Sequence, residues 1–195
     1  MSIPTPLTEA EVRPAEAAPA RGPSLLREII ETILLTAVIY AVVNFTTGRF
    51  RIEGPSMEPS FQQNERVLVD KLSYMFSDPR RGDVVVFNYP LATERDFIKR
   101  VIGLPGDSVD IISGMVRVNG QELDEPYIKE PPRSEGHWLV GPGQYFVMGD
   151  NRNSSSDSRT WGALDRQYLI GRAVVVYWPL SELGLVKHFA YNAAP

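Results

Sequence analysis

Two side chains, Ser56 and Lys99, have the chemistry of a nucleophile and a base. Ser56 lies in a turn constrained by glycine and proline, in the segment GPSMEPSF from Gly54 to Phe61. A serine hydroxyl becomes a nucleophile only when a base removes its proton. Because the chain has no cysteine and only two histidines, a lysine is the base to consider, and Lys99 is the candidate.

Lys99 lies in FIKRVI, a run from Phe97 to Ile102 that predicts a strand. Side chains alternate along a strand, so Lys99 shares a face with Phe97 and Val101, while Arg100 points away. A lysine with an ordinary pKa of about 10.4 is neutral in only about one molecule in 2500 at pH 7. Burial that lowers the pKa to about 8 corresponds to roughly 3 kcal/mol, which is within the range that enzymes use. Taken singly, such a serine is usually structural and such a lysine usually lies at an exposed edge.

Three further segments combine charged or hydroxyl side chains with glycine or proline. They read GDVVVF, IKRVIGLPGD and GDNRNSSSDSR, at residues 82–87, 98–107 and 149–159. By itself the last segment is a polar turn cluster in which Asp157 and Arg159 form a surface ion pair of little energetic value. The chain has no GxSxG, GxxxxGK[ST] or GxGxxG signature, so the chemistry has to come from these segments together.

The composition excludes several classes of protein. A formal net charge of -4 over 195 residues disfavours a nucleic-acid partner, which requires a basic surface. The absence of cysteine excludes a thiolate nucleophile or metal site, and His137 and His188 lie far apart with no HExxH spacing. We therefore expect one folded domain with a tail, and no metal.

The N-terminal quarter of the chain predicts a membrane anchor. Residues 1–23 are rich in proline and show no periodicity, which indicates a flexible tail. The 17 residues from Thr32 to Gly48 carry no charge and reach about 26 Å as a helix, against a hydrocarbon core of about 30 Å. We expect a single spanning helix over residues 24–48, with a soluble core helix and a cleaved export signal as alternatives. Arginines on both sides leave its orientation undecided.

Residues 49–195 predict a mostly antiparallel β domain. Turn residues separate short apolar or alternating runs, and Asn119-Gly120 after such a run is a hairpin signal. Residues 181–191 could form a short helix or cap a strand. The predicted strands cover residues 67–69, 84–87, 97–102, 109–112, 115–118, 145–148 and 173–178.

Together and in this order, the four segments resemble the signature boxes of bacterial type I signal peptidases, which are membrane-anchored serine proteases with a Ser/Lys dyad. The similarity extends to Trp161-Gly162 and to GRAVVVYWPL at residues 171–180, which resembles the closing strand of the family. The resemblance implies one N-terminal transmembrane helix followed by an antiparallel β-sheet catalytic domain over residues 49–195. It also implies that no metal or cofactor is needed.

Carried over to this chain, the resemblance makes Ser56 the nucleophile and oxyanion-binding amide, and Lys99 the general base. Ser155 would hydrogen-bond the lysine amine, Asp157 and Arg159 would brace the loop as an ion pair, and Asp150 and Arg152 would support them. Some members have a second oxyanion donor, a serine, where this chain has Gly54, and losing such a donor can cost about 10²- to 10³-fold in rate. Asn153 and Ser60 replace a usual acid and a usual threonine. The implied substrate-binding residues are Phe50, Ile52, Met57, Phe97 and Ile98.

The function implied by the resemblance is removal of N-terminal signal peptides from exported preproteins after Ala-x-Ala type sites. The implied partners are those signal peptides and membrane lipid, and we expect a monomer. By analogy with the family, the tail is cytoplasmic and the catalytic domain lies outside the cell membrane, which the chain crosses once. Two alternatives are a catalytically inactive β domain that tethers a partner at the membrane, and a self-cleaving repressor, whose DNA-binding module the N-terminal region does not resemble.

Overall fold

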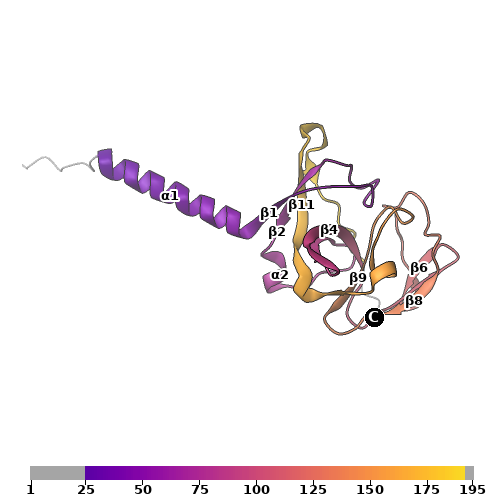
Figure 1. Cartoon of the computed structure of the whole chain (residues 1–195). Coiled ribbons are helices and arrows are strands. Elements are labelled where there is room, and N and C mark those ends of the chain that lie inside the picture. The colour runs from indigo at the N-terminus through magenta and orange to yellow at the C-terminus, as the bar shows by residue number, and fades with distance from the viewer. Residues whose placement is uncertain (1–24, 192–195) are drawn as a thin grey trace, which may run out of the picture. The chain divides into compact units, whose positions relative to one another are not determined.

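The computed structural model describes residues 25–191, so the predicted tail of residues 1–23 lies outside the described residues. The helix as far as Tyr40 forms one compact unit, and residues 41–195 form a second. The second unit holds all the strands (Figure 1).

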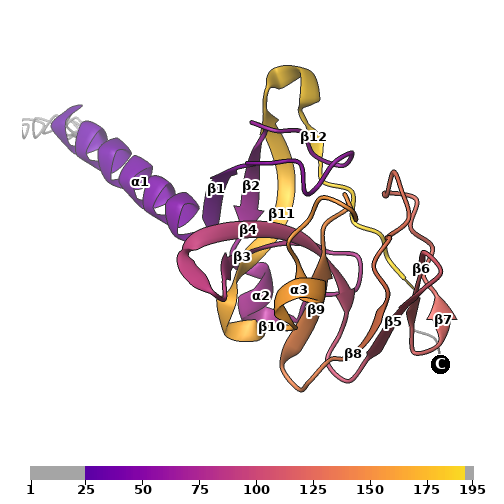
Figure 2. The same ribbon diagram turned by 45° about the vertical axis from the view of Figure 1, so that its right-hand side comes forward.

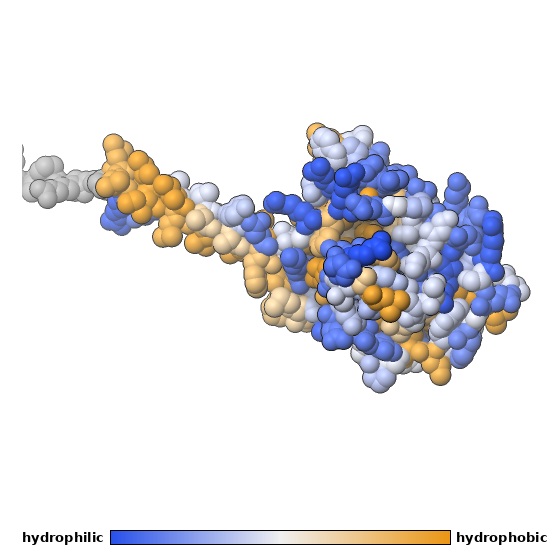
Figure 3. All heavy atoms as spheres, viewed as in Figure 1, coloured by the Kyte–Doolittle hydropathy of each residue, from blue (hydrophilic) through white to orange (hydrophobic). Residues whose placement is uncertain are grey.

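Helix α1, Leu25–Thr46, is apolar on most of its surface, and none of its residues is buried (Figure 3). The hydroxyls of Thr32 and Thr36 donate to backbone carbonyls one turn earlier, at 2.8 Å each, so these polar groups are satisfied within the helix. Its 22 residues give a length of about 33 Å, and by length and composition the helix can cross a membrane.

The helix ends two residues before the predicted boundary at Gly48. Strand β1, Thr47–Arg51, starts immediately and pairs with β2, Arg66–Asp70. The carbonyl of Thr46 accepts a hydrogen bond from the Lys71 amide at 2.9 Å. The backbone therefore leaves the helix early because pairing with β2 satisfies it instead.

The larger sheet is antiparallel throughout, with the order β1-β2-β11-β3-β4-β9-β10, and β12 pairs with β11 (Figure 1). Both faces of β3 are covered: Val84 and Val86 join one apolar cluster, while Val85 and Phe87 join another. This is why residues 84–87 are apolar without alternation. The remaining strands of this sheet are β3 (Val84–Tyr89), β4 (Ala92–Gly103), β9 (Gln144–Met148), β10 (Leu164–Asp165), β11 (Leu169–Trp178) and β12 (Gly184–Leu185).

A smaller sheet of four strands lies on the far side of the domain from β1 and β2 (Figure 2). Its order is β7-β6-β5-β8. Asn119 and Gly120 have φ angles of 52° and 78° and join β6 to β7, which confirms the predicted hairpin. The strands are β5 (Ser108–Ile112), β6 (Met115–Val118), β7 (Gln121–Glu122) and β8 (Gly136–Leu139).

Short helical turns complete the domain. They are α2 (Ser73–Phe76), α3 (Ser158–Trp161) and 3-10 turns at Arg166–Tyr168 and Leu180–Glu182. The segment at 181–191, which the sequence left open, contains the end of the second 3-10 turn and β12, and continues without regular structure to residue 191. The predicted fold class, a mostly antiparallel β domain behind one apolar helix, is confirmed.

Candidate active site

Ser56 and Lys99 meet although 43 residues separate them. The Lys99 Nζ lies 2.8 Å from the Ser56 Oγ and 2.8 Å from the Ile98 carbonyl oxygen. Ser56 stands in a turn between β1 and β2, closed by a hydrogen bond from the Glu58 amide to the Pro55 carbonyl at 3.1 Å. Lys99 is on β4 and is only 3% exposed. The two reacting groups are thus within the distance that proton transfer requires.

Burial lowers the pKa of Lys99 from an ordinary 10.5 to about 8. Desolvation is the main cause, because a buried ammonium loses its hydration, and the nearby carboxylates of Asp157 and Asp150 oppose the shift. The Phe97 ring lies 5.2 Å from the amine, on the face shared by the two side chains. A substantial fraction of Lys99 is therefore neutral near pH 8 and can accept a proton.

The loop at residues 149–159 is hydrogen-bonded to the backbone at Pro55 and Ser56. The Asn151 amide donates to the Ser56 carbonyl, and its side-chain Nδ2 donates to the Pro55 carbonyl, both at 3.1 Å. The sequence analysis did not single out Asn151. The position of Asn151 inside the GDNR segment could have indicated a role at the site. Only the fold shows that this loop lies against the turn that carries Ser56.

Asp157 and Arg159 form the predicted ion pair, and they are not on the surface. Two bonds of 2.8 and 2.7 Å join the guanidinium to the carboxylate, whose side chain has no exposed area. The carboxylate also accepts from the Gly149 amide at 3.0 Å. The ion pair is therefore present and mostly buried, so the alternative interpretation as an exposed pair is wrong, and its role in bracing the loop stays a prediction.

Asp150 and Arg152 also lie beside the site, but each has a partner that the sequence analysis missed. Arg100 makes two hydrogen bonds to the Asp150 carboxylate, at 2.9 and 2.7 Å, and both side chains are buried. Ser60 donates to the same carboxylate at 2.5 Å. Arg152 is paired with Glu125 at 2.8 Å. As the alternation along the strand predicts, the Arg100 side chain points to the opposite face of β4 from Lys99. That face is buried as well, and Arg100 is only 1% exposed.

Ser155 does not contact Lys99 in the way that the resemblance implied. Its hydroxyl is buried, with no hydrogen-bond partner in the part of the chain that the structure describes. The Lys99 amine instead uses the Ile98 carbonyl, the acceptor next to it in sequence. The Ser155 hydroxyl instead lies beside Gly149, where a Cβ would clash with it. A supporting role for this serine stays a prediction.

Gly149 is a position where a single methyl group should disturb the site. A Cβ there would clash with the Ser56 carbonyl oxygen and the Ser155 hydroxyl, and one of these is backbone that cannot rotate away. We expect Gly149→Ala to lower kcat about 10²-fold, because a displacement of about 1 Å at a reacting group costs that much. The control is Gly184→Ala, where the nearest atom is 3.8 Å away. Equal kcat values for the two variants would contradict this account.

A cleft of about 650 Å³ opens beside the dyad. Four of the five residues assigned to substrate binding line it, namely Phe50, Ile52, Phe97 and Ile98. The assignment of Met57 is wrong. Its side chain is 1% exposed and belongs to the apolar core with Phe61, because the turn after Ser56 directs it inward. Charged side chains at the rim, which the sequence analysis did not identify, are Arg49, Arg51, Glu53, Glu94, Arg95 and Asp96.

The Ser56 amide is available as an oxyanion donor. Within residues 25–191 it makes no backbone hydrogen bond. Gly54 has a φ of 78°, a conformation that L side chains rarely adopt, although nothing lies within 4 Å of a Cβ built there. The backbone conformation at this turn, and not crowding, is therefore what favours glycine at position 54.

Comparison with known proteins identifies the family. A model of the family described as signal peptidase, peptidase S26, matches residues 26–178. The chain belongs to this family. It is 43% identical over 190 residues to a signal peptidase I of Leptolyngbya laminosa, with 93% of each chain covered. It is 47% identical over 169 residues to a probable signal peptidase I-2 of Synechocystis sp., covering 83% of this chain and 78% of that one.

Among solved structures, a signal peptidase I from Enterococcus faecalis is similar, with a TM-score of 0.46 and 30% sequence identity. The match covers 49% of this chain and 97% of that one. A signal peptidase IB of Staphylococcus aureus is 33% identical over 193 residues, covering 87% of this chain. The predicted family is confirmed, and so is the prediction that the chain is an enzyme, a hydrolase of peptide bonds.

Proposed function

We propose that this chain removes N-terminal signal peptides from exported preproteins, with Ser56 as nucleophile and Lys99 as general base. The observation that carries the proposal is the 2.8 Å approach of a buried lysine amine to a serine hydroxyl. The neutral amine takes the hydroxyl proton as the Ser56 Oγ attacks the scissile carbonyl carbon. The same proton passes to the leaving amine, and an ester joins Ser56 to the signal peptide. Lys99 then takes a proton from water, whose oxygen attacks the ester carbonyl; the C–O bond to Ser56 breaks, the proton passes from Lys99 to the Ser56 Oγ, and the signal peptide leaves as its acid.

The negative charge on the carbonyl oxygen needs donors already in place. The Ser56 amide supplies one, and Gly54 supplies no side chain for a second. We therefore assign the oxyanion site to backbone amides. The pairing of the Asn151 amide with the Ser56 carbonyl supports this assignment, because it holds the peptide unit of the nucleophile in one orientation.

The cleft suits an extended peptide. Among the described strands, β1 pairs only with β2, and the first part of β4, from Ala92 to Lys99, pairs only with β3, so each presents an edge. An extended substrate can hydrogen-bond to such edges as an added strand. Alternate side chains would then point at the apolar floor made by Phe50, Ile52 and Ile98. Shallow apolar walls favour small side chains such as alanine near the cut.

Helix α1 supports attachment to the cell membrane as a single-pass anchor. The apolar segment of a signal peptide lies in the same bilayer, so confinement of enzyme and substrate near one plane raises their effective concentration. We place the catalytic domain on the extracytoplasmic side, where exported preproteins arrive. A monomer is sufficient for this mechanism, because Ser56 and Lys99 come from one chain.

The pH dependence of cleavage tests the proposed base. With a preprotein carrying an Ala-x-Ala site, we expect kcat/KM to rise about tenfold per pH unit below pH 8 and to level off above it, because the pKa of Lys99 is lowered to about 8. The control is Ser56→Ala, which should give no cleavage at any pH. A flat profile between pH 6 and 9 would exclude Lys99 as the base. No cleavage by the unmodified chain would favour the inactive tethering domain instead.

A further inference from the structure

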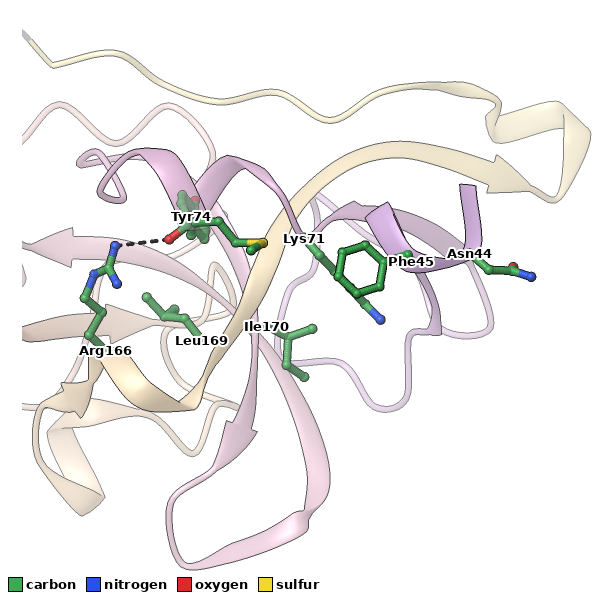
Figure 4. Close-up of a pocket in the computed structure, with 8 residues that line it drawn as sticks. Asn44, Phe45, Lys71, Tyr74, Arg166, Leu169 and Ile170 are labelled. Atoms are coloured by element: carbon green, nitrogen blue, oxygen red, sulfur yellow. Dashed lines mark hydrogen bonds between the residues drawn. The ribbon is translucent and has the colours of Figure 1, made fainter. Parts of the chain in front are cut away.

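A second hollow, of about 430 Å³, lies apart from the cleft and shares no lining residue with it (Figure 4). Its walls come from the last turn of α1, the residue that follows β2, helix α2, the 3-10 turn that begins at Arg166 and the start of β11. The lining residues are Asn44, Phe45, Lys71, Tyr74, Met75, Arg166, Leu169 and Ile170. The mechanism uses none of them.

The hollow has one positive charge that the described residues leave without a counter-ion. The Lys71 side chain is half-buried, and among residues 25–191 it has no hydrogen-bond or ion-pair partner. The neighbouring carboxylate of Asp70 is occupied by the Leu72 amide at 2.8 Å and by Ser73. Arg166, by contrast, is bound to Asp78 at 3.0 Å. An anion would complement Lys71.

Four of the lining residues are apolar, namely Phe45, Met75, Leu169 and Ile170. Lys71 and Phe45 both line the hollow, and Ile170 and Leu169 line it from β11 (Figure 4). The side chains of Phe45 and Met75 are 72% and 62% exposed. One cation beside several exposed apolar groups matches an amphiphile better than a small polar anion, which would leave these groups facing water.

The position of the hollow along the chain adds a second argument, which rests on the proposed membrane anchoring. Helix α1 spans about 33 Å, so if one end is at one surface of a hydrocarbon core of about 30 Å, the other end is at the opposite surface. Asn44 and Phe45 belong to that last turn. The hollow therefore lies at the depth of the lipid headgroups.

We propose that this hollow binds one anionic phospholipid, with its phosphate on Lys71 and the upper part of an acyl chain along Phe45, Met75 and Ile170. The carbonyl of Thr46 already accepts from the Lys71 amide, so the bound headgroup connects the helix end to β2. Strand β2 pairs along its whole length with β1, which carries Phe50 at the cleft. Lipid bound here would steady the strand that forms one side of the cleft.

The test uses the full chain in phosphatidylcholine nanodiscs containing a small fraction of photoactivatable lipid. The reactive diazirine sits near the top of the acyl chain of either phosphatidylglycerol or phosphatidylcholine, and labelled residues are identified by mass spectrometry. We expect phosphatidylglycerol to label residues 45, 75 or 170 about fivefold more than phosphatidylcholine, the preference that one lysine gives for an anionic lipid. Lys71→Gln should remove this preference, and Lys129→Gln, at an exposed lysine outside the hollow, should keep it.

Equal labelling of these residues by the two lipids, or an unchanged preference in Lys71→Gln, would overturn the proposal. The experiment is repeated in Ser56→Ala, so that its result does not depend on catalysis. Failure of the chain to enter nanodiscs would overturn both the proposed anchor and this inference, whereas cleavage of a short peptide in detergent reports separately on the proposed reaction.

Discussion

Lys99→Met should abolish cleavage and, at pH 7, make the protein more stable than the unmodified chain. On the proposed mechanism, this change removes the one group among residues 25–191 that is hydrogen-bonded to the Ser56 hydroxyl, and we expect kcat to fall by about 10⁴-fold or more, as for other nucleophile and base pairs. Methionine fills similar space without a charge to desolvate. Initial rates on a preprotein substrate measure the first effect, and urea unfolding measures the second.

The gain in stability has a definite dependence on pH. The pKa of Lys99 is about 8 in the folded chain, against an ordinary 10.5, so between these values the unfolded chain binds more protons and stability rises with pH. The cost of burying the ammonium, roughly 3 kcal/mol, is fully present below pH 8 and disappears above about pH 10.5. Lys99→Met should therefore be stabilising at pH 7 and no longer stabilising near pH 10.5.

Ser56→Ala provides the matched control for Lys99→Met. It should remove activity to the same extent, because the dyad acts as a unit, but leave the amine buried and its pH-dependent cost in place. Cleavage retained by either variant would refute the dyad. A difference in stability between Lys99→Met and the unmodified chain that did not change with pH would show that the lysine is not desolvated as described.

Arg100→Met should greatly lower the stability of the fold. The guanidinium is held by two bonds to Asp150 and by the carbonyls of Gly82 and Lys187, at 2.9 and 3.1 Å. Removing it leaves the Asp150 carboxylate buried with Ser60 as its remaining side-chain partner. Breaking one side of a buried ion pair typically costs about 3–5 kcal/mol, which denaturant unfolding can measure. Activity should fall as well, since Asp150 adjoins Asn151, which holds the nucleophile turn.

The double variant Arg100→Met with Asp150→Leu distinguishes an unpaired charge from lost packing. Because both charges are gone, it should be markedly more stable than Arg100→Met alone. The exposed pair of Arg133 and Glu130 is the control, and Arg133→Met should change the free energy of unfolding by less than about 1 kcal/mol. If Arg100→Met lowered the free energy of unfolding by less than about 1 kcal/mol, the buried pair would not be important for stability.

The sequence alone determined the features that depend on local pattern. The apolar helix can be predicted because its 22 residues carry charge only near the start. Seven of the strands could be predicted because their apolar runs end at turn residues. The hairpin could be predicted because Asn119-Gly120 favours positive φ angles, which a two-residue turn requires. Ser56 and Lys99 could be selected because the chain has no cysteine and only two histidines, and because four segments occur in the order that resembles the family. The structure places the two side chains in contact.

Other strands were not predicted, because they form through hydrogen bonds to neighbouring strands and not through a pattern in their own residues. β1 reads TGRFR, with two arginines, and is a strand because β2 pairs with it from Thr47 to Arg51. Strands β7, β10 and β12 have two residues each, which is too short for an alternating pattern. Met57 was misassigned for a related reason, since adjacency to the nucleophile does not tell which way a side chain in a turn points.

Only the tertiary structure decided the electrostatics of the site. The lowered pKa of Lys99 comes from the protein that surrounds it, and the partners Arg100 with Asp150 and Arg152 with Glu125 are 50 and 27 residues apart. Free energies of desolvation and ion pairing depend on distances across the fold, and residue order does not contain these distances. The sequence pattern thus singled out the serine and the lysine, and folding created the buried environment that lowers the pKa of the lysine amine.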